Sequence, residues 1–372
     1  PEAREVLAEQ DGTLAEDVVV AGGVLVTTHL EDAAPVLRRW SLDGEALGHI
    51  DITGGTVLAL DGDAERDELL VTVSSVTSAS QAFHVTPSTG AVRELSFLEE
   101  DWEPPAVRVT RHRARSADGT LVPYWLVRRE DAPAGPVPTL QYGYGGFNVP
   151  LGLWFSPTNI AWVSAGGAVA VANLRGGGEF GAAWYDGGRL ANKQNVFDDF
   201  AAVAHHLVAE GVTTHRQLAA YGGSNGGLLV GALITQHPDI VAAAAPMVGV
   251  LDLLRFHKFT IGSAWISDYG DPDVAEDFGI ALAYSPLHNV TDGAHYPATI
   301  VVTGDHDDRV VPAHSHKFTA TLQAAQGGDA PILTRVETST GHGAGKPRAV
   351  AAQEIADVIT FFAHHTGLTP PS

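Results

Sequence analysis

The sequence predicts an α/β protein in which a doubly wound, mostly parallel sheet follows an all-β region. Three observations support this. From residue 104 onward, short apolar runs alternate with helical patterns, which is typical of a parallel sheet covered by helices on both faces. Before residue 104 the chain holds only short β-rich runs between turns. Glu103-Pro104-Pro105 separates the two patterns. We therefore expect domains at residues 1–103 and 104–372.

The first region resembles a chain of short strands with an internal repeat. Turn signals such as Asp43-Gly44 and Thr89-Gly90 interrupt it. The run that starts at Val24 is echoed by one that starts at Leu69, 45 residues later (69 − 24). A period of about 40–45 residues with several short strands is typical of propeller blades, and an ordinary β-meander is the alternative. About two blades fit. The β-rich runs are residues 18–20, 24–28, 36–40, 47–52, 57–60 and 69–73.

The second region opens with a predicted hairpin, residues 106–115 and 121–129, around Asp118-Gly119. Strand–helix alternation follows, so we expect parallel strands joined by crossover helices. The strands are predicted at residues 138–142, 168–172, 218–221, 241–246, 298–303 and 332–336. The helices are predicted at residues 196–209, 225–236, 313–325 and 349–366.

Composition excludes several functions. The chain has 44 acidic and 22 basic side chains, for a formal charge of −22, so we expect it to repel nucleic acid and anionic membranes. It has no cysteine, which excludes thiol catalysis, disulfides and cysteine-ligated zinc. No uninterrupted apolar run reaches the roughly 18 residues of a membrane span. We expect a cytoplasmic protein without cofactor or metal.

The strongest chemical motif is Gly222-Gly223-Ser224-Asn225-Gly226, between a predicted strand and a predicted helix. The pattern Gly-x-Ser-x-Gly in this context is the nucleophile turn of an α/β-hydrolase, where only small residues fit beside the serine. The backbone N–H of Asn225 then points toward a developing oxyanion near the helix N-terminus. A glycine-rich turn with an incidental serine is the alternative.

An acid and a base follow in the chain order that this fold requires. Residues 304–309 come after one predicted strand and offer three carboxylates, Asp305, Asp307 and Asp308. His342, between two glycines, comes after the next strand. Such loops meet at the same sheet edge, where a serine hydroxyl can be activated by an oriented histidine.

Other motifs do not carry a function. Gly176, Gly178 and Gly181 match a dinucleotide fingerprint, but no acidic residue ends a strand about 20 residues later. Residues 343–346 hint at a phosphate loop, but Pro347 replaces the required Ser or Thr. The pairs His314/His316 and His205/His206 lie on predicted helices without a suitable carboxylate, so we expect surface histidines.

Together these residues resemble the prolyl oligopeptidase family. The resemblance covers about residues 104–370. The matching motifs are residues 142–148, 173–181, 222–227, 256–265, 305–312 and 341–346. Residues 1–103 would then be the last blades of a propeller. The resemblance selects Asp307 among the three carboxylates and gives the triad Ser224, Asp307 and His342.

The resemblance also implies a role for the residues around the triad. The Tyr144 hydroxyl would be the second oxyanion donor beside the Asn225 N–H, and Arg309 would bind a substrate carbonyl. The proline pocket would consist of Trp265, Phe147, Tyr269, Val250 and Val310. An aromatic face with apolar walls suits proline, whose ring is flat and apolar.

The implied activity is hydrolysis of short peptides on the carboxyl side of proline through an acyl-enzyme, with the propeller restricting access to oligopeptides. Preference for basic residues, as in oligopeptidase B, would need acidic groups in the pocket. Peptide joining into rings, a non-peptidase esterase and a pseudo-hydrolase that binds a partner through its propeller are alternatives. Two blades leave open sheet edges. We expect that this chain is the C-terminal part of a longer polypeptide, with an N-terminal fragment completing the propeller.

Overall fold

The computed structural model describes residues 4–8, 13–52, 55–95, 102–338, 340–343 and 345–369. The chain divides into two compact units. The first consists of Pro1–Pro105 with two later segments, Pro150–Ile160 and Gly178–Trp184. The second consists of Ala106–Val149, Ala161–Gly177 and Tyr185–Ser372. The sequence patterns did not predict that the two later segments belong to the first unit.

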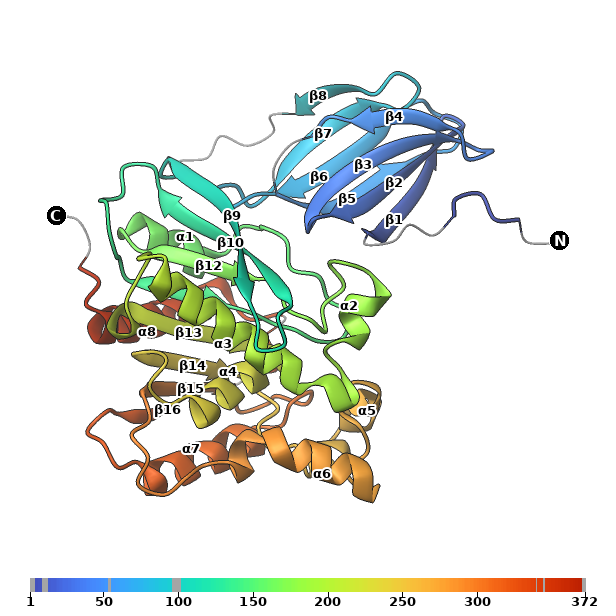
Figure 1. Ribbon diagram of the computed structural model, residues 1–372. Helices are drawn as coiled ribbons and strands as arrows, with labels where there is room; N and C mark the ends of the chain where they lie inside the picture. The colour runs from blue at the N-terminus through green and yellow to red at the C-terminus, as the bar shows by residue number, and fades with distance from the viewer. Residues whose placement is uncertain are drawn as a thin grey trace. The chain divides into compact units, whose positions relative to one another are not determined.

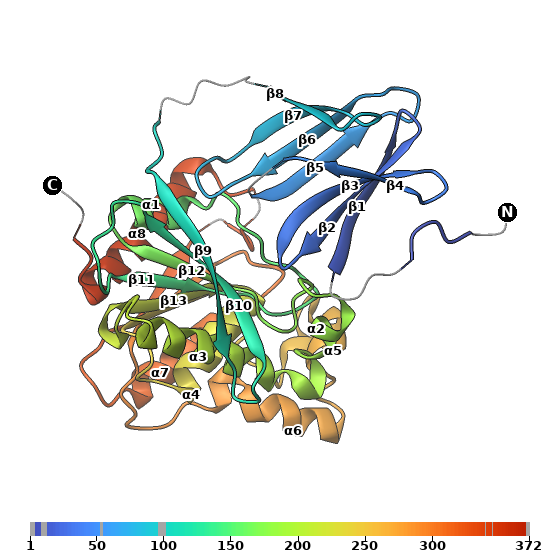
Figure 2. The same ribbon diagram turned by 45° about the horizontal axis from the view of Figure 1, so that its top comes forward.

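The first unit holds two four-stranded sheets, each antiparallel and each in chain order (Figures 1 and 2). Five of the six predicted runs lie within strands, the run at residues 47–52 extends two residues past β4, and the last two strands were not predicted. The first sheet is β1 (Thr13–Ala21), β2 (Val24–Glu31), β3 (Ala34–Ser41) and β4 (Ala46–Ile50). The second is β5 (Thr56–Gly62), β6 (Leu69–Ser74), β7 (Gln81–Thr86) and β8 (Ala91–Leu95).

The 45-residue repeat of the sequence corresponds to the repeat of these sheets. Val24 begins β2 and Leu69 begins β6, which are the second strands of their sheets. Val26 of the first sheet and Val71 of the second are fully buried in one shared apolar cluster. Each sheet is thus one four-stranded unit of the kind that forms a propeller blade.

The second unit is built on an eight-stranded sheet in the order β16-β15-β14-β13-β11-β12-β10-β9. Strand β10 is antiparallel to both of its neighbours, β9 and β12. The other six strands, β16, β15, β14, β13, β11 and β12, run parallel to one another. The strands are β9 (Val107–Arg115), β10 (Leu121–Arg129), β11 (Thr139–Tyr142), β12 (Ala168–Ala172), β13 (Leu218–Gly223), β14 (Ala243–Met247), β15 (Ala298–Gly304) and β16 (Ile332–Glu337). All of them lie where the sequence predicts strands.

Helices cover both faces of this sheet (Figure 1). Helix α3 (Gln194–Ala209) packs beside α4 (Asn225–Gln236), and α7 (Ala313–Ala325) packs on β15 and β16. Helix α8 (Arg348–Thr366) packs on β13–β15, and its Phe362 ring meets Trp162 of α1 (Pro157–Ser164) edge to face. The sequence predicts α3, α4, α7 and α8. It does not predict α1, α2 (Ala182–Asp186), α5 (Ile266–Tyr269) and α6 (Ala275–Tyr284).

Among the described residues, no helix is both long enough and apolar enough to span a membrane.

Candidate active site

Ser224 lies at the sharp turn between β13 and α4, and its backbone is in a conformation that L-residues rarely adopt (φ 59°, ψ −116°). Gly222 and Gly226 make this turn sterically feasible. A Cβ atom on Gly222 would lie 2.6 Å from the Gly226 carbonyl oxygen, and one on Gly226 would lie 2.7 Å from that of Gly143. Strain of this kind persists only where the surrounding structure enforces it, and it is frequent at catalytic residues.

Asp307 and His342 form a hydrogen-bonded pair. His342 Nδ1 lies 2.7 Å from Asp307 Oδ2, while Asp307 Oδ1 accepts the backbone N–H groups of Arg309 (3.0 Å) and Val310 (2.9 Å). Asp307 is 3% exposed. A carboxylate opposite Nδ1 makes that nitrogen the donor and leaves Nε2 as the basic nitrogen.

The sheet explains why these two residues meet. Strands β15 and β16 are neighbours, and their last residues, Gly304 and Glu337, pair in register. The following loops are joined by a hydrogen bond from His306 N–H to the Thr340 carbonyl (3.1 Å). Asp305 instead contacts the His306 ring at 2.6 Å, and Asp308 is exposed. Ala344, within the predicted motif at residues 341–346, lies outside the described residues.

Tyr144 and Asn225, the predicted oxyanion donors, lie beside Ser224. Burial and then the Asp268 carboxylate raise the pKa of the half-buried Tyr144 hydroxyl, whereas the Arg309 charge and a hydrogen bond with the Ser224 side chain lower it. The net effect is a phenol that keeps its proton and can donate. Asn225 is 1% exposed, and its side chain makes two hydrogen bonds. Its Nδ2 donates to the Tyr144 carbonyl, and its Oδ1 accepts from the Tyr269 hydroxyl (2.8 Å).

Aromatic rings cluster next to this turn. The Phe147 and Tyr269 ring centroids lie 5.5 Å apart, edge to face, and Trp265 stacks on Phe256 at 6.3 Å. Phe147 and Trp265 are half-buried, so part of each side chain is accessible. Phe256, which the sequence analysis did not select, is fully buried and also packs on Tyr269 at 5.3 Å.

The three remaining predicted pocket residues differ in exposure. Val250 and Val310 are buried at 2% and 1% exposure and belong to the same apolar core cluster as the rings. Arg309 is exposed, and its charge acts on Tyr144. An accessible cation beside a serine and a phenol can bind a carbonyl oxygen of a peptide.

A buried ion pair that the sequence analysis missed lies behind these residues. Lys193, just before α3, and Asp268, on α5, are 1% and 0% exposed, and Nζ lies 3.5 Å from Oδ1. Asp268 Oδ2 also accepts the Phe147 N–H (3.2 Å) and the Tyr185 hydroxyl (3.0 Å). The two residues are 75 positions apart, and no local sequence pattern links them.

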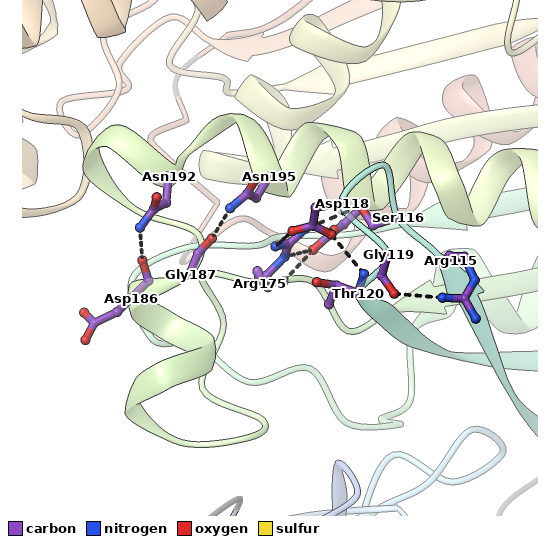
Figure 3. Close-up of polar contacts among 11 residues, drawn as sticks. Arg115, Ser116, Asp118, Gly119, Thr120, Arg175, Asp186, Gly187, Asn192 and Asn195 are labelled. Carbon is purple, nitrogen blue, oxygen red and sulfur yellow. Dashed lines mark hydrogen bonds and ion pairs between the residues drawn. The ribbon is translucent and has the colours of Figure 1, made fainter.

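A second buried cation, Arg175, lies in the loop after β12 (Figure 3). Its guanidinium donates to both carboxylate oxygens of Asp199 on α3, at 2.9 and 2.6 Å, and at 2.5 Å to Asp118 in the β9–β10 turn. In the same view, Asn192 and Asn195 donate to the carbonyls of Asp186 and Gly187. These contacts fix the loops around residues 175–177 and 186–188.

The histidine pairs are placed as follows. His205 is an exposed residue of α3, as predicted. The surface prediction is wrong for His314, which is 1% exposed on α7 and accepts the Asp252 N–H at Nδ1 (3.0 Å). Burial lowers the pKa of His314 to about 4, so the ring is neutral and acts as a hydrogen-bond acceptor. The sequence pattern could not show that this face of α7 turns inward.

Among the described residues, one group of side chains has the types and spacing of metal ligands. Ligand atoms of His257, Asp271 and Asp273 lie within 4.8 Å of one another. However, the Lys258 ammonium lies 2.9 Å from Asp273 Oδ1 and already supplies a cation there. The arrangement by itself does not indicate a metal centre.

The geometry around Ser224 suits acyl transfer. A strained serine, a histidine oriented by a buried carboxylate, and a protonated phenol are the kinds of group that acyl transfer needs as nucleophile, base and oxyanion donor.

Comparisons with known proteins agree with this chemistry. The model of the prolyl oligopeptidase family matches residues 153–369. A prolyl endopeptidase of Elizabethkingia miricola is 39% identical over 98% of this chain and 52% of its own length. A prolyl endopeptidase of Dictyostelium discoideum is 37% identical over 97% of this chain and 49% of its own length. The chain therefore spans about half the length of these relatives.

Solved structures are similar as well. One from a study of two prolyl endopeptidases is 40% identical, with a TM-score of 0.94, over 98% of this chain and 54% of that one. Prolyl oligopeptidase B of Galerina marginata, bound to a 35mer hydrolysis and macrocyclization substrate, is 34% identical, with a TM-score of 0.94, over 100% of this chain and 53% of that one. The predicted fold class, propeller strands followed by an α/β-hydrolase sheet, is confirmed. The chain belongs to the prolyl oligopeptidase family.

Proposed function

We propose that this chain carries the catalytic centre of a serine endopeptidase that cleaves short peptides on the carboxyl side of proline. The observation that carries the proposal is the 2.7 Å contact between His342 Nδ1 and Asp307 Oδ2, on loops at the same sheet edge as the strained Ser224. A histidine oriented by a buried carboxylate at this edge of the sheet is what activation of a serine requires.

The proposed reaction has two steps. Ser224 Oγ attacks the carbonyl carbon of the proline residue while His342 Nε2 takes the hydroxyl proton, and the same nitrogen then gives that proton to the leaving amine of the next residue. The C–N bond breaks and an ester to Ser224 remains. A water molecule, deprotonated by His342, attacks this ester. The bond to Ser224 Oγ breaks, His342 returns the proton to Oγ, and the new carboxyl end leaves. Asp307 orients the imidazole, and the Tyr144 hydroxyl and the Asn225 N–H stabilise the oxyanion.

Proline selectivity is proposed from the rings and from the relatives. Phe147 and Trp265 are partly accessible, Val250 and Val310 are buried, and a proline ring needs no hydrogen-bond partner. The relatives at 37–39% identity are named prolyl endopeptidases. In this proposal Arg309 binds a substrate carbonyl, and Tyr269 acts mainly by holding Asn225.

The decisive experiment compares matched fluorogenic peptides that differ only in Pro, Ala, Arg or Phe before the scissile bond. We expect the highest kcat/KM for Pro and a loss on the order of 10⁶-fold in kcat for Ser224→Ala, because triad members act as a unit. Equal turnover of all four peptides would contradict proline selectivity and indicate a general esterase or peptidase. Fluorophosphonate labelling of the wild type but not of Ser224→Ala excludes a pseudo-hydrolase.

The acyl-enzyme could also be captured by an amine. A dual function macrocyclase-peptidase of Galerina marginata is 35% identical over 99% of this chain. Mass spectrometry of the products separates hydrolysis, which adds one water, from ring formation, which leaves the mass of the released segment lower by that water. Restriction of access by the propeller and the cytoplasmic location stay predictions.

A further inference from the structure

The backbone of residues 144–147, which we call the oxyanion segment, is held by side chains from three other parts of the second unit. Lys193 Nζ donates to the Gly145 carbonyl (2.9 Å), Asp268 Oδ2 accepts the Phe147 N–H (3.2 Å), and Asn225 Nδ2 donates to the Tyr144 carbonyl. The segment needs such support because Gly145 (φ 64°) and Phe147 (φ 57°) both have left-handed backbone conformations. For Phe147, which has a Cβ, this conformation costs free energy.

Burial of the charged Lys193 side chain at this place costs free energy. Lys193 is 1% exposed, and burial lowers its pKa to about 8, against the opposing effect of Asp268. Its partners within the described residues are the Gly145 carbonyl, the Asp268 carboxylate and the Tyr269 ring, whose centroid lies 5.3 Å from Nζ. An apolar side chain of similar length would avoid the cost of burying the charge. A role for the charge is therefore sought in the groups that it contacts.

The opposite side of the segment is also held by contacts. Asn148 N–H donates to the Gly176 carbonyl (3.1 Å), and a Cβ on Gly145 would lie 2.3 Å from Val196 Cγ1. The Gly176 loop is itself fixed through the Arg175 ion pairs of Figure 3. With this support behind it, the Lys193 contact at Gly145 holds the backbone next to Tyr144.

We propose that Lys193, held by Asp268, is a positioning residue that sets the Tyr144 hydroxyl for the oxyanion, through the Gly145 carbonyl. The inference rests on the proposed function, since it assigns a use to Tyr144 in acyl transfer. Lys193 does not touch the reacting atoms. A misplacement of about 1 Å of a catalytic group can cost roughly 10²-fold in rate, so the expected effect is large.

The test is a double-mutant cycle between Lys193→Met and Tyr144→Phe, with kcat and KM measured on the Pro peptide. We expect Lys193→Met to lower kcat by about 10²-fold with little change in KM, because only the transition state uses the oxyanion donor. In the Tyr144→Phe background the same substitution should lower kcat by less than about threefold, since the group being positioned is gone. Leu207→Ala, at the buried far end of α3, the helix that begins next to Lys193, controls for lost stability.

A loss of kcat that is the same in both backgrounds, or no loss, would overturn the inference. If Lys193→Met does not fold, the cycle is run with the double variant Lys193→Met/Asp268→Asn under the same criteria. This variant removes both charges and so leaves no unpaired buried carboxylate. Failure of the proposed function is seen separately, as absent fluorophosphonate labelling and absent Pro-peptide cleavage by the wild type.

Discussion

Tyr144 illustrates how a single residue acquires a function from its surroundings. Burial and the Asp268 carboxylate raise the pKa of its hydroxyl, so the group donates at neutral pH. We expect Tyr144→Phe to lower kcat by about 10²–10³-fold with little change in KM, as for loss of one oxyanion donor. Steady-state kinetics on a Pro peptide provide the measurement.

The matched control for that substitution is Tyr124→Phe. Tyr124 is a fully buried tyrosine on β10, and its hydroxyl lies 3.0 Å from His206 Nδ1, away from the proposed centre. Its kcat should stay near the wild-type value. If the two variants lose the same amount of activity, Tyr144 is a packing residue and not a donor.

Trp265 is the residue that we expect to determine selectivity for proline. It is half-buried and stacks on Phe256, and part of its side chain is accessible. Trp265→Ala should lower the Pro-to-Ala ratio of kcat/KM by up to about tenfold, because an aromatic contact is worth roughly 0.5–1.5 kcal/mol beyond area burial. Trp125→Ala, a half-buried tryptophan on β10, is the control. Equal losses of kcat/KM on the Pro and Ala peptides would show that Trp265 does not contact the proline ring.

At the scale of elements, Arg175 joins the β9–β10 turn to α3. Its two carboxylate partners differ sharply, since the Asp199 side chain is fully buried and that of Asp118 is 45% exposed. We expect Asp199→Asn to cost about 3 kcal/mol, because it leaves a buried guanidinium undercompensated. Asp118→Asn should cost less than about 1 kcal/mol, since solvent screens that pair. Thermal unfolding measures both, and the same loss of Tm for the two variants would contradict this account.

The Arg175–Asp118 pair also predicts a pH dependence. The hydrogen bond from Arg175 is the main cause that lowers the pKa of Asp118 to about 2, from an ordinary value of 3.8. The unfolded chain therefore binds this proton more readily than the folded one. The pair stabilises the fold fully above about pH 4, and its contribution is lost as the pH falls toward 2. The Tm difference between the wild type and Asp118→Asn should shrink over that window and stay constant from pH 5 to 7.

At the scale of the whole molecule, the charge of −22 creates a field that attracts cationic peptides. For two Pro peptides with Lys or Glu at their amino ends, we expect the Lys peptide to have a kcat/KM about tenfold higher at low salt. The ratio should fall toward one at about 0.5 M salt, where the screening length is only a few ångström. An uncharged Pro peptide is the control. A ratio independent of salt would show that local contacts, and not the global field, select the charge.

Much of the site follows from local sequence. The turn at Ser224 needs a strand before it, a helix after it, and small residues at Gly222 and Gly226. All of these are neighbours in the chain. The strands of the large sheet are apolar runs bounded by turns, so their positions are also predictable. Helices α1, α2, α5 and α6 were missed because they are short, with 8, 5, 4 and 10 residues. Of α6, only Ala281 and Tyr284 are buried.

What the sequence by itself determined is the order of chemistry along the chain: a serine at a strand–helix turn, then a carboxylate loop, then a histidine loop, behind a repeat of short strands. The tertiary structure decided which groups meet. It pairs His342 with Asp307 and not with Asp305 or Asp308, and it joins Lys193 to Asp268 across 75 residues. The physical reason is that a buried ion pair is favourable only where burial and partners coincide in space, and neither can be read from one segment of the chain.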